Sequence, residues 1–194
     1  MKKYTQLYTE IDQSIKLKKK LLKFEKKIDE VIDKVYKTLK NKGKIFICGN
    51  GGSAADAQHL SAEFLVRLNP KVNRKPFPII SLAMDSSTLT ACGNDYGFKY
   101  IFSRNLEALA DKKDLLIFIS TSGNSKNIIE VLKQSKKMGI FSIGFLGAGG
   151  GKAKKLSNIN LLVPHNNVAR IQESHIFLGH FILNEVEKKL LKKS

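Results

Sequence analysis

Short apolar runs alternate with helical patterns along most of this chain, and that alternation most constrains its fold. The apolar runs lie at 45–48, 78–83, 115–119, 140–145 and 159–163. Between them lie helical patterns, over 54–67, 98–110 and 125–138, and over a shorter stretch near 152–156. Strands and helices in alternation form a parallel sheet with helices on both faces. The sequence therefore predicts an α/β fold, a three-layer αβα sandwich with a five-stranded parallel sheet.

A long helical pattern precedes the first strand. Residues 3 to about 41 contain neither Pro nor Gly, and apolar positions at helical spacing face Lys on the opposite side. A break is expected near residues 18–20, and Gly43 suits the end of the helix. The apolar stripe packs either on a partner subunit or on its own domain. We divide the chain into an N-terminal helical arm, 1–42, and one domain, 43–194.

Composition narrows the choice of partner and compartment. The net charge is +17, from 34 basic and 17 acidic side chains, but only four of the basic residues are Arg. Lys is less suited than Arg to bidentate contacts with bases or phosphates, so we interpret the excess as a solvated surface and expect no nucleic-acid partner. Cys48, beside a buried strand, and Cys92, in a predicted loop, form no disulfide framework. With no signal peptide or membrane-length apolar run, we expect a cytoplasmic protein and no membrane partner.

The turn after the first apolar run carries the strongest functional signal. Asn50, Gly51, Gly52 and Ser53 stand between a predicted strand and a predicted helix. Free backbone N–H groups and the positive end of the helix dipole make such a turn an anion site. On the same helix His59 and Glu63 are four residues apart and share a face. A phosphate cradle near a paired imidazole and carboxylate indicates chemistry on a phosphorylated small molecule.

Three later segments follow other predicted strands. The turn 120–125 holds four hydroxyl residues, more than a helix cap needs, and is predicted to bind phosphate: Ser120, Thr121, Ser122 and Ser125. The segment 93–97 is a second polar loop, after a short helix that follows the second predicted strand. An ordinary turn and a functional loop both stay open for it. The glycine-rich segment 147–152 lacks the spacing of a dinucleotide site and is expected to be a flexible connection.

The final helical pattern, from about Ala169 to Leu191, carries Gln172, His175 and His180. At 100° per residue Gln172 lies about 60° from His175 and about 80° from His180, so geometry alone slightly prefers His175 as its partner. A mixed nitrogen and oxygen set suited to Zn²⁺ is available, although its spacing alone is weak evidence for a metal: His59, Glu63, Gln172 and His180.

At this point the chain resembles a known family, the phosphoheptose isomerases of the SIS (sugar isomerase) domain proteins. The resemblance runs from the arm to the last helix, and its motifs come in matching order, at 49–57, 93–98, 120–125 and 170–173. It implies interconversion of sedoheptulose 7-phosphate and D-glycero-D-manno-heptose 7-phosphate, towards nucleotide-activated heptose (ADP- or GDP-heptose) for lipopolysaccharide or capsule. It also implies a cytoplasmic homotetramer with active sites between subunits.

The same resemblance implies the roles of individual residues. One Zn²⁺ per subunit is bound by His59, Glu63, Gln172 and His180. Substrate contacts match Asn50, Gly51, Gly52, Ser53, Glu63, Asn94, Asp95, Ser120, Thr121, Ser122, Ser125 and Gln172. Glu63 is the catalytic base and His180 its acid–base partner, which leaves His175 a packing or supporting role; whether Glu63 acts mainly as base or as ligand stays open. Some members have Asp where this chain has Ala169, so an acidic contact there is absent.

Two other functions compete with this isomerase. A non-catalytic SIS protein, such as an adaptor for the replication initiator or a sugar-phosphate sensor, would not need the four ligand residues. Their joint presence favours the enzyme. Another isomerase of the same fold, acting on a shorter or differently configured sugar phosphate, differs in pocket length, which the sequence does not show.

Overall fold

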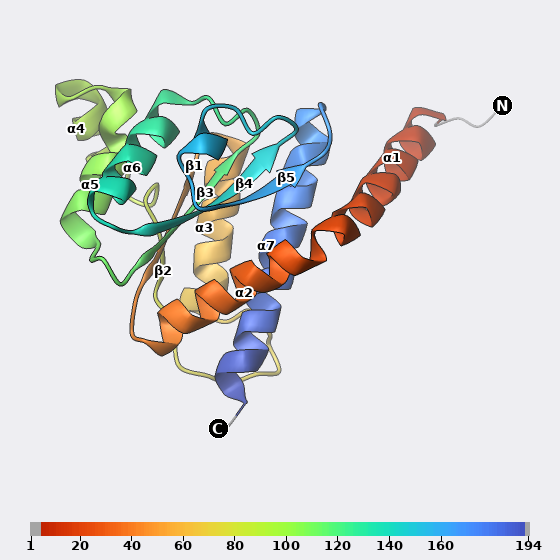
Figure 1. The fold of residues 1–194 in the computed structure, drawn as a ribbon, viewed down its shortest axis with the longest axis horizontal. Coiled ribbons are helices and arrows are strands. Elements are labelled where there is room, and N and C mark those ends of the chain that lie inside the picture. The colour runs from red at the N-terminus through yellow and green to blue at the C-terminus, as the bar shows by residue number, and fades with distance from the viewer. Residues whose placement is uncertain (1–4, 193–194) are drawn as a thin grey trace.

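A five-stranded parallel sheet forms the centre of the part of the chain that the structure, a computed structural model, describes, residues 5–192 (Figure 1). The strand order is β2-β1-β3-β4-β5, and every neighbouring pair is parallel. The strands are β1 (Ile45–Gly49), β2 (Ile79–Ser81), β3 (Leu115–Ser120), β4 (Phe141–Gly147) and β5 (Ile159–Val163). The predicted sheet and its five apolar runs are confirmed.

Helices cover both faces of the sheet and complete the predicted three layers (Figure 1). One face carries α2 (Glu25–Lys40), α3 (Gly52–Leu65) and α7 (Val168–Leu191). The other carries α4 (Ser86–Asp95), α5 (Ile101–Leu109) and α6 (Lys126–Lys137). Short 3-10 turns lie at Leu22–Phe24, Phe98–Tyr100 and Ala153–Lys155. The predicted helix near 152–156 is thus a single turn.

Strand β1 shows why the runs are apolar without interruption. Ile45 and Ile47 pack into the core beneath α2, α3 and α7, whereas Phe46 and Cys48 pack into the core beneath α4 to α6. Successive side chains of a strand point to opposite faces, and here both faces are covered. All five residues of β1 are therefore buried.

The N-terminal arm divides where the chain bends between two helices. Helix α1 (Thr5–Leu21) extends away from the body, whereas α2 packs beside α7 (Figure 1). The break lies at Leu22–Phe24, one turn after the predicted position, and residues 1–4 of the predicted arm lie outside the described residues. Arg170 of α7 holds α1 by donating to the carbonyl oxygen of Glu10 at 3.1 Å.

Two local predictions need correction. The predicted loop 93–97 begins inside α4, which ends at Asp95, so Cys92 is a buried helical residue. Helix α4 persists this far because Asp85 caps its start, accepting from the N–H of Ser87 at 2.9 Å, and because Cys92 packs into the core.

The end of α2 also differs from the prediction. The left-handed residue after α2 is Lys42, with φ of 60°, rather than Gly43. Gly43 serves close packing, since a Cβ atom there would lie 2.6 Å from the carbonyl oxygen of Lys113.

The strand order reverses beside β1. Strand β1 lies between β2 and β3. The chain therefore crosses from β1 to β2 on one side, and then from β2 to β3 on the other side of β1. In open parallel sheets ligands bind at the carboxyl ends of the strands where this reversal occurs. The turns after β1 and β3 meet there, because Gly49 pairs with Ile119 in the sheet.

Candidate active site and metal centre

The turn between β1 and α3 is shaped by glycines. Gly51 has φ of 56°, and a Cβ atom at Gly49 would lie 2.5 Å from the carbonyl oxygen of Ser53. The side-chain amides of Asn50 and Asn127 donate to each other's oxygens, at 2.9 and 2.7 Å. This pairing ties the turn to the first turn of α6. The N-terminus of α3 is thereby held at the carboxyl edge of the sheet, where an anion site was predicted.

The serine-rich turn between β3 and α6 is closed by its own hydroxyls. Ser120 Oγ accepts from the N–H of Gly123 at 3.0 Å, and Ser122 Oγ accepts from the N–H of Asn124 at 3.2 Å. Ser125 stands at the N-cap of α6, yet its side chain accepts no capping bond from the described residues. The first N–H groups of a helix have no partner within it. This end of α6 can therefore donate to an anion.

The glycine-rich segment 147–152 supports this turn, in place of the flexible connection predicted for it. The N–H of Lys152 donates to Asn124 Oδ1 at 3.0 Å. A Cβ atom at Gly151 would lie 2.4 Å from the carbonyl oxygen of Ser122, and one at Gly147 would lie 2.2 Å from that of Thr121. Glycine is needed there because two backbones pack in direct contact.

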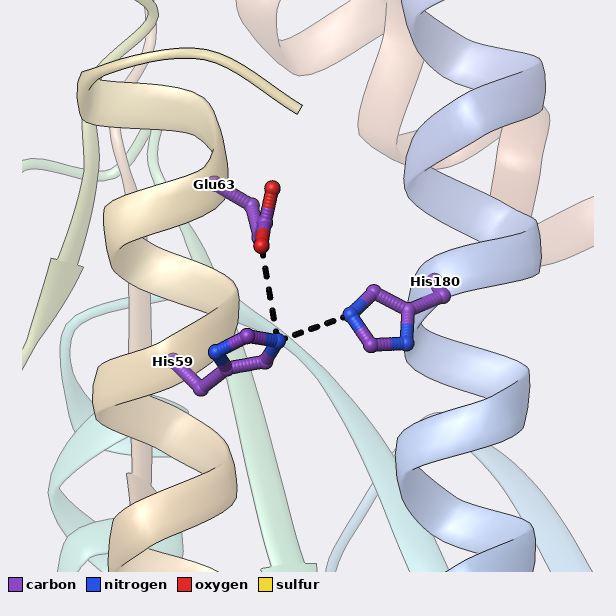
Figure 2. A group of neighbouring side chains, drawn as sticks. All are labelled: His59, Glu63 and His180. Carbon is purple, nitrogen blue, oxygen red and sulfur yellow. Dashed lines mark hydrogen bonds and ion pairs between the residues drawn. The ribbon is translucent and has the colours of Figure 1, made fainter. Parts of the chain in front are cut away.

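Three side chains converge between α3 and α7, as Figure 2 shows. His59 and Glu63 project from one face of α3, with 3.4 Å between His59 Nε2 and Glu63 Oε1. His180 reaches across from α7, and its Nε2 lies 2.8 Å from His59 Nε2. The two rings stand nearly perpendicular, at 89°. The structure therefore brings together three of the four predicted ligands.

The surroundings of His180 change its pKa in opposing directions. Burial, and then the nearby His59, lower the pKa of His180, while Glu63 acts in the opposite direction. At the 2.8 Å separation one ring must donate and the other accept. One turn earlier on α3, burial raises the pKa of Asp56, whose Oδ2 has no partner among the described residues.

The cluster fits a divalent metal. Its three ligand atoms all lie within 4.8 Å of one another. Atoms at about 2.0–2.2 Å from a tetrahedral zinc ion lie roughly 3.3 Å apart. The observed separations of 2.8 and 3.4 Å fall on either side of that value. Two imidazoles and a carboxylate are also donors that zinc favours.

The other polar residues of α7 separate into different surroundings. The amide of Gln172 lies against Gly52, where an added Cβ atom would be 2.6 Å from its Nε2, so ligation by Gln172 stays a prediction. His175 is fully buried, its ring centroid 6.2 Å from that of Phe145. Its ring nitrogens have no hydrogen-bond partner among the described residues, and burial lowers its pKa to about 4. His175 is a packed core residue.

The remaining predicted substrate contacts divide by exposure. Ser53 and Ser120 are buried, while Thr121 is half-buried. Asn94 and Asp95 are exposed at the end of α4, where Asn94 Nδ2 donates to Asp95 Oδ1 at 2.8 Å. Substrate contact by these residues stays a prediction.

A groove opens beside the cluster. It has a volume of about 430 Å³ and lies along α7 next to His180. Leu68, Asn69 and Pro70 line its opposite side. One wall is apolar, formed by Phe177 and Phe181 of α7.

Arg74 is a buried residue near the cluster that the sequence did not single out. Its side chain is only 1% exposed and pairs with Glu187 of α7, with 2.5 Å between Arg74 Nε and Glu187 Oε1. It also donates to the carbonyl oxygen of Glu63, at 2.9 Å. In the sequence, Arg74 lies in an irregular segment with no periodic pattern, and its partner is 113 residues away.

The chain is similar in sequence and in fold to proteins of one known family. A family model described as the SIS domain matches residues 11–147. A phosphoheptose isomerase of Campylobacter concisus is 56% identical over 151 residues, covering 78% of this chain and 79% of the relative. One of Clostridium acetobutylicum is 44% identical over 184 residues, covering 93% of each. The solved phosphoheptose isomerase of Francisella tularensis superposes with a TM-score of 0.91 at 32% identity, covering 97% of this chain and 100% of that one.

Proposed function

This chain belongs to the phosphoheptose isomerase family of SIS-domain proteins, and we propose that the cluster of His59, Glu63 and His180 is its reaction centre. The protein is a sugar-phosphate isomerase, interconverting sedoheptulose 7-phosphate and D-glycero-D-manno-heptose 7-phosphate. The observation that carries the proposal is the approach of His180 from α7 to within 2.8 Å of His59 on α3.

The reaction moves a proton between adjacent carbons through an enediol(ate). Glu63 is the base that removes the proton from the carbon next to the carbonyl and returns it to the neighbouring carbon. His180 exchanges protons with the substrate oxygens. Burial lowers its pKa and so favours the neutral ring, which is the form that can accept a proton. Such acid–base catalysis contributes about 10²- to 10⁴-fold.

The proposed cofactor is one Zn²⁺ per subunit, held by His59, Glu63 and His180 with Gln172 as the fourth ligand. When bound, the metal would polarise the substrate carbonyl and stabilise developing negative charge. Glu63 then has two proposed roles, and tight coordination would lower its basicity. The 20% exposure of its side chain leaves it accessible to a substrate.

The substrate is proposed to lie between the cluster and the carboxyl edge of the sheet. Its phosphate binds the turn of Ser120, Thr121, Ser122 and Ser125, where the start of α6 offers uncapped N–H groups. The turn after β1, with Gly51, Gly52 and Ser53, and the end of α4, with Asn94 and Asp95, contact the sugar. Binding energy from the phosphate sets the register of the reacting carbons.

The proposed assembly and cellular setting rest on the family resemblance and on the apolar arm. We propose a homotetramer with residues 1–42 as its oligomerisation arm and active sites between subunits, working in the cytoplasm towards heptose for lipopolysaccharide or capsule. In support, Leu7 and Ile11 of α1 are about half exposed, at 55% and 48%. Among the helices in the described part of the chain, none has the length and apolar composition needed to span a membrane.

Incubation with sedoheptulose 7-phosphate, followed by NMR, tests the function. We expect the aldose product from the native protein and at least a hundredfold slower formation with Glu63→Gln. Phosphate-ester binding without turnover would instead favour the non-catalytic SIS protein. Faster conversion of a shorter sugar phosphate would favour the other isomerase of the same fold, which acts on such a sugar.

A further inference from the structure

A single buried side chain joins the backbone of Glu63 to the helix that carries His180. Helix α3 ends at Leu65, two residues after Glu63. The last carbonyl groups of a helix have no partner within it, and helix ends fray. Arg74 donates to two of these carbonyl groups: its Nη2 to the oxygen of Glu63 and its Nη1 to that of Phe64, each at 2.9 Å. The carbonyl oxygen of Phe64 also accepts from the N–H of Phe77 at 3.0 Å.

The same guanidinium is anchored on α7. Arg74 Nε pairs with Glu187 Oε1 at 2.5 Å, and the two side chains are 1% and 4% exposed. Glu187 stands seven residues after His180, two helical turns along the same face. The guanidinium also lies over the rings of Phe64 and Phe77, at 5.2 and 4.8 Å from their centroids. Its position is therefore fixed by charge, hydrogen bonds and packing together.

A second contact holds the two helices together beside the cluster. Gly179 directly precedes His180 on α7, and Leu60 directly follows His59 on α3. A Cβ atom at Gly179 would lie 2.5 Å from Leu60 Cδ1. The helices are thus in close contact at the histidines and joined again by Arg74 at the end of α3. Between these two points lies Glu63.

We propose that Arg74, paired with Glu187, is a positioning residue that sets the placement of Glu63 relative to His180. The pair acts on the backbone of Glu63 and on the helix of His180, without touching substrate. This inference rests on the proposed function of the cluster. A side chain that only stabilises the fold would give the same buried pair, so the test must separate positioning from stability.

Two variants make that separation. Arg74→Lys keeps a positive charge but loses the planar fork that reaches two carbonyls. The double variant Arg74→Met with Glu187→Leu removes both charges together, a replacement that buried ion pairs often tolerate without loss of stability.

The control is an ion pair that also joins two helices but lies on the surface. Lys189 of α7 pairs with Asp33 of α2, their side chains 45% and 50% exposed. Asp33→Asn should leave kcat, KM and zinc affinity within about twofold of the native protein.

Three quantities are measured for each variant: kcat and KM with sedoheptulose 7-phosphate, zinc affinity by competition with a chromogenic chelator without substrate, and the thermal unfolding midpoint. We expect kcat and zinc affinity to fall about 10- to 100-fold in folded Arg74→Lys and in the folded double variant, with KM changed less than about threefold. A folded variant of either kind with native kcat and zinc affinity would overturn the proposal and leave the pair a stabilising role alone. Inactivity of the native protein would overturn the proposed function instead, and the zinc measurement would still test the positioning.

Discussion

Two histidines five residues apart on α7 meet opposite surroundings. His175 is buried against Phe145, with its ring nitrogens unpartnered among the described residues. His180 is partly exposed and contacts His59 across the gap between helices. A proton-transfer group must be accessible, and of the two rings only that of His180 is partly exposed.

Substitution of each histidine should separate the two. His180→Gln should lower kcat at least about a hundredfold with the fold intact, because it removes acid–base catalysis. His175→Gln should lose much less. Steady-state kinetics with sedoheptulose 7-phosphate, with circular dichroism to check folding, measure both. The reverse order of losses would show that the proton shuttle has been assigned to the wrong histidine.

The buried His175 should also make stability depend on pH. Burial lowers its pKa from 6.5 to about 4, so between these values the unfolded chain binds more protons than the folded one. The contribution is fully present above pH 6.5 and is lost as the pH falls towards 4. At pH 5 it should cost roughly 2 kcal/mol of unfolding free energy.

Urea unfolding of metal-free protein at pH 7 and pH 5 measures that cost. His175→Gln cannot ionise there, so its loss between the two pH values should be smaller than that of the native protein by roughly 2 kcal/mol. Equal losses in the two proteins would mean that His175 is not held neutral by burial.

Residue-level prediction from the sequence succeeded where the chemistry is local. His59 and Glu63 share a helix face by spacing alone, and the structure places them 3.4 Å apart. The choice of His180 over His175 required the family pattern, because helical angles do not fix how α7 is rotated relative to α3. Arg74 was missed because its role depends on carbonyl groups of α3 and on Glu187, contacts that only the tertiary fold creates.

At the scale of elements, the start of α6 is the feature with the sharpest consequence. Ser122 holds the turn through the N–H of Asn124, and Ser125 leaves the helix end uncapped by a side chain from the described residues. An anion at this end is favoured by the helix dipole and by the free N–H groups.

Removal of those hydroxyls should weaken substrate binding more than turnover. Ser122→Ala and Ser125→Ala should each raise KM several-fold and leave kcat within about threefold, because phosphate contacts far from the reacting carbons are largely uniform binding. Steady-state kinetics measure the split. An unchanged KM in both variants would move the phosphate away from this turn.

Elements were predictable where burial alone decides them. The five strands read as apolar runs because both of their faces are covered, whereas α4 was cut short because Gly93, Asn94 and Asp95 favour turns. The cap at Asp85 and the burial of Cys92 outweigh that local preference. Segment 147–152 was misjudged for the same reason: its glycines permit backbone contact with another loop, which composition does not reveal.

At the scale of the whole molecule, one group of exposed apolar side chains lies on the arm and the adjoining face of α7. Leu7, Ile11 and Ile15 of α1 are 48–55% exposed, and Phe177 and Phe181 of α7 are each 43% exposed. An apolar groove of about 220 Å³ lies between the α1–α2 junction and these phenylalanines. A partner subunit would cover this surface, as the proposed tetramer requires.

Polar substitution on the arm should therefore dissociate the assembly without unfolding the domain. Half-exposed Leu or Ile side chains contribute roughly 1 kcal/mol each when a partner covers them, and three change in every subunit. Replacing Leu7, Ile11 and Ile15 by Gln should shift the proposed tetramer to smaller species in light scattering at micromolar concentration. Leu109→Gln, an equally exposed residue on α5, should not. Activity should fall with dissociation, because the active sites are proposed to lie between subunits; a native chain that is a stable monomer would contradict the assembly.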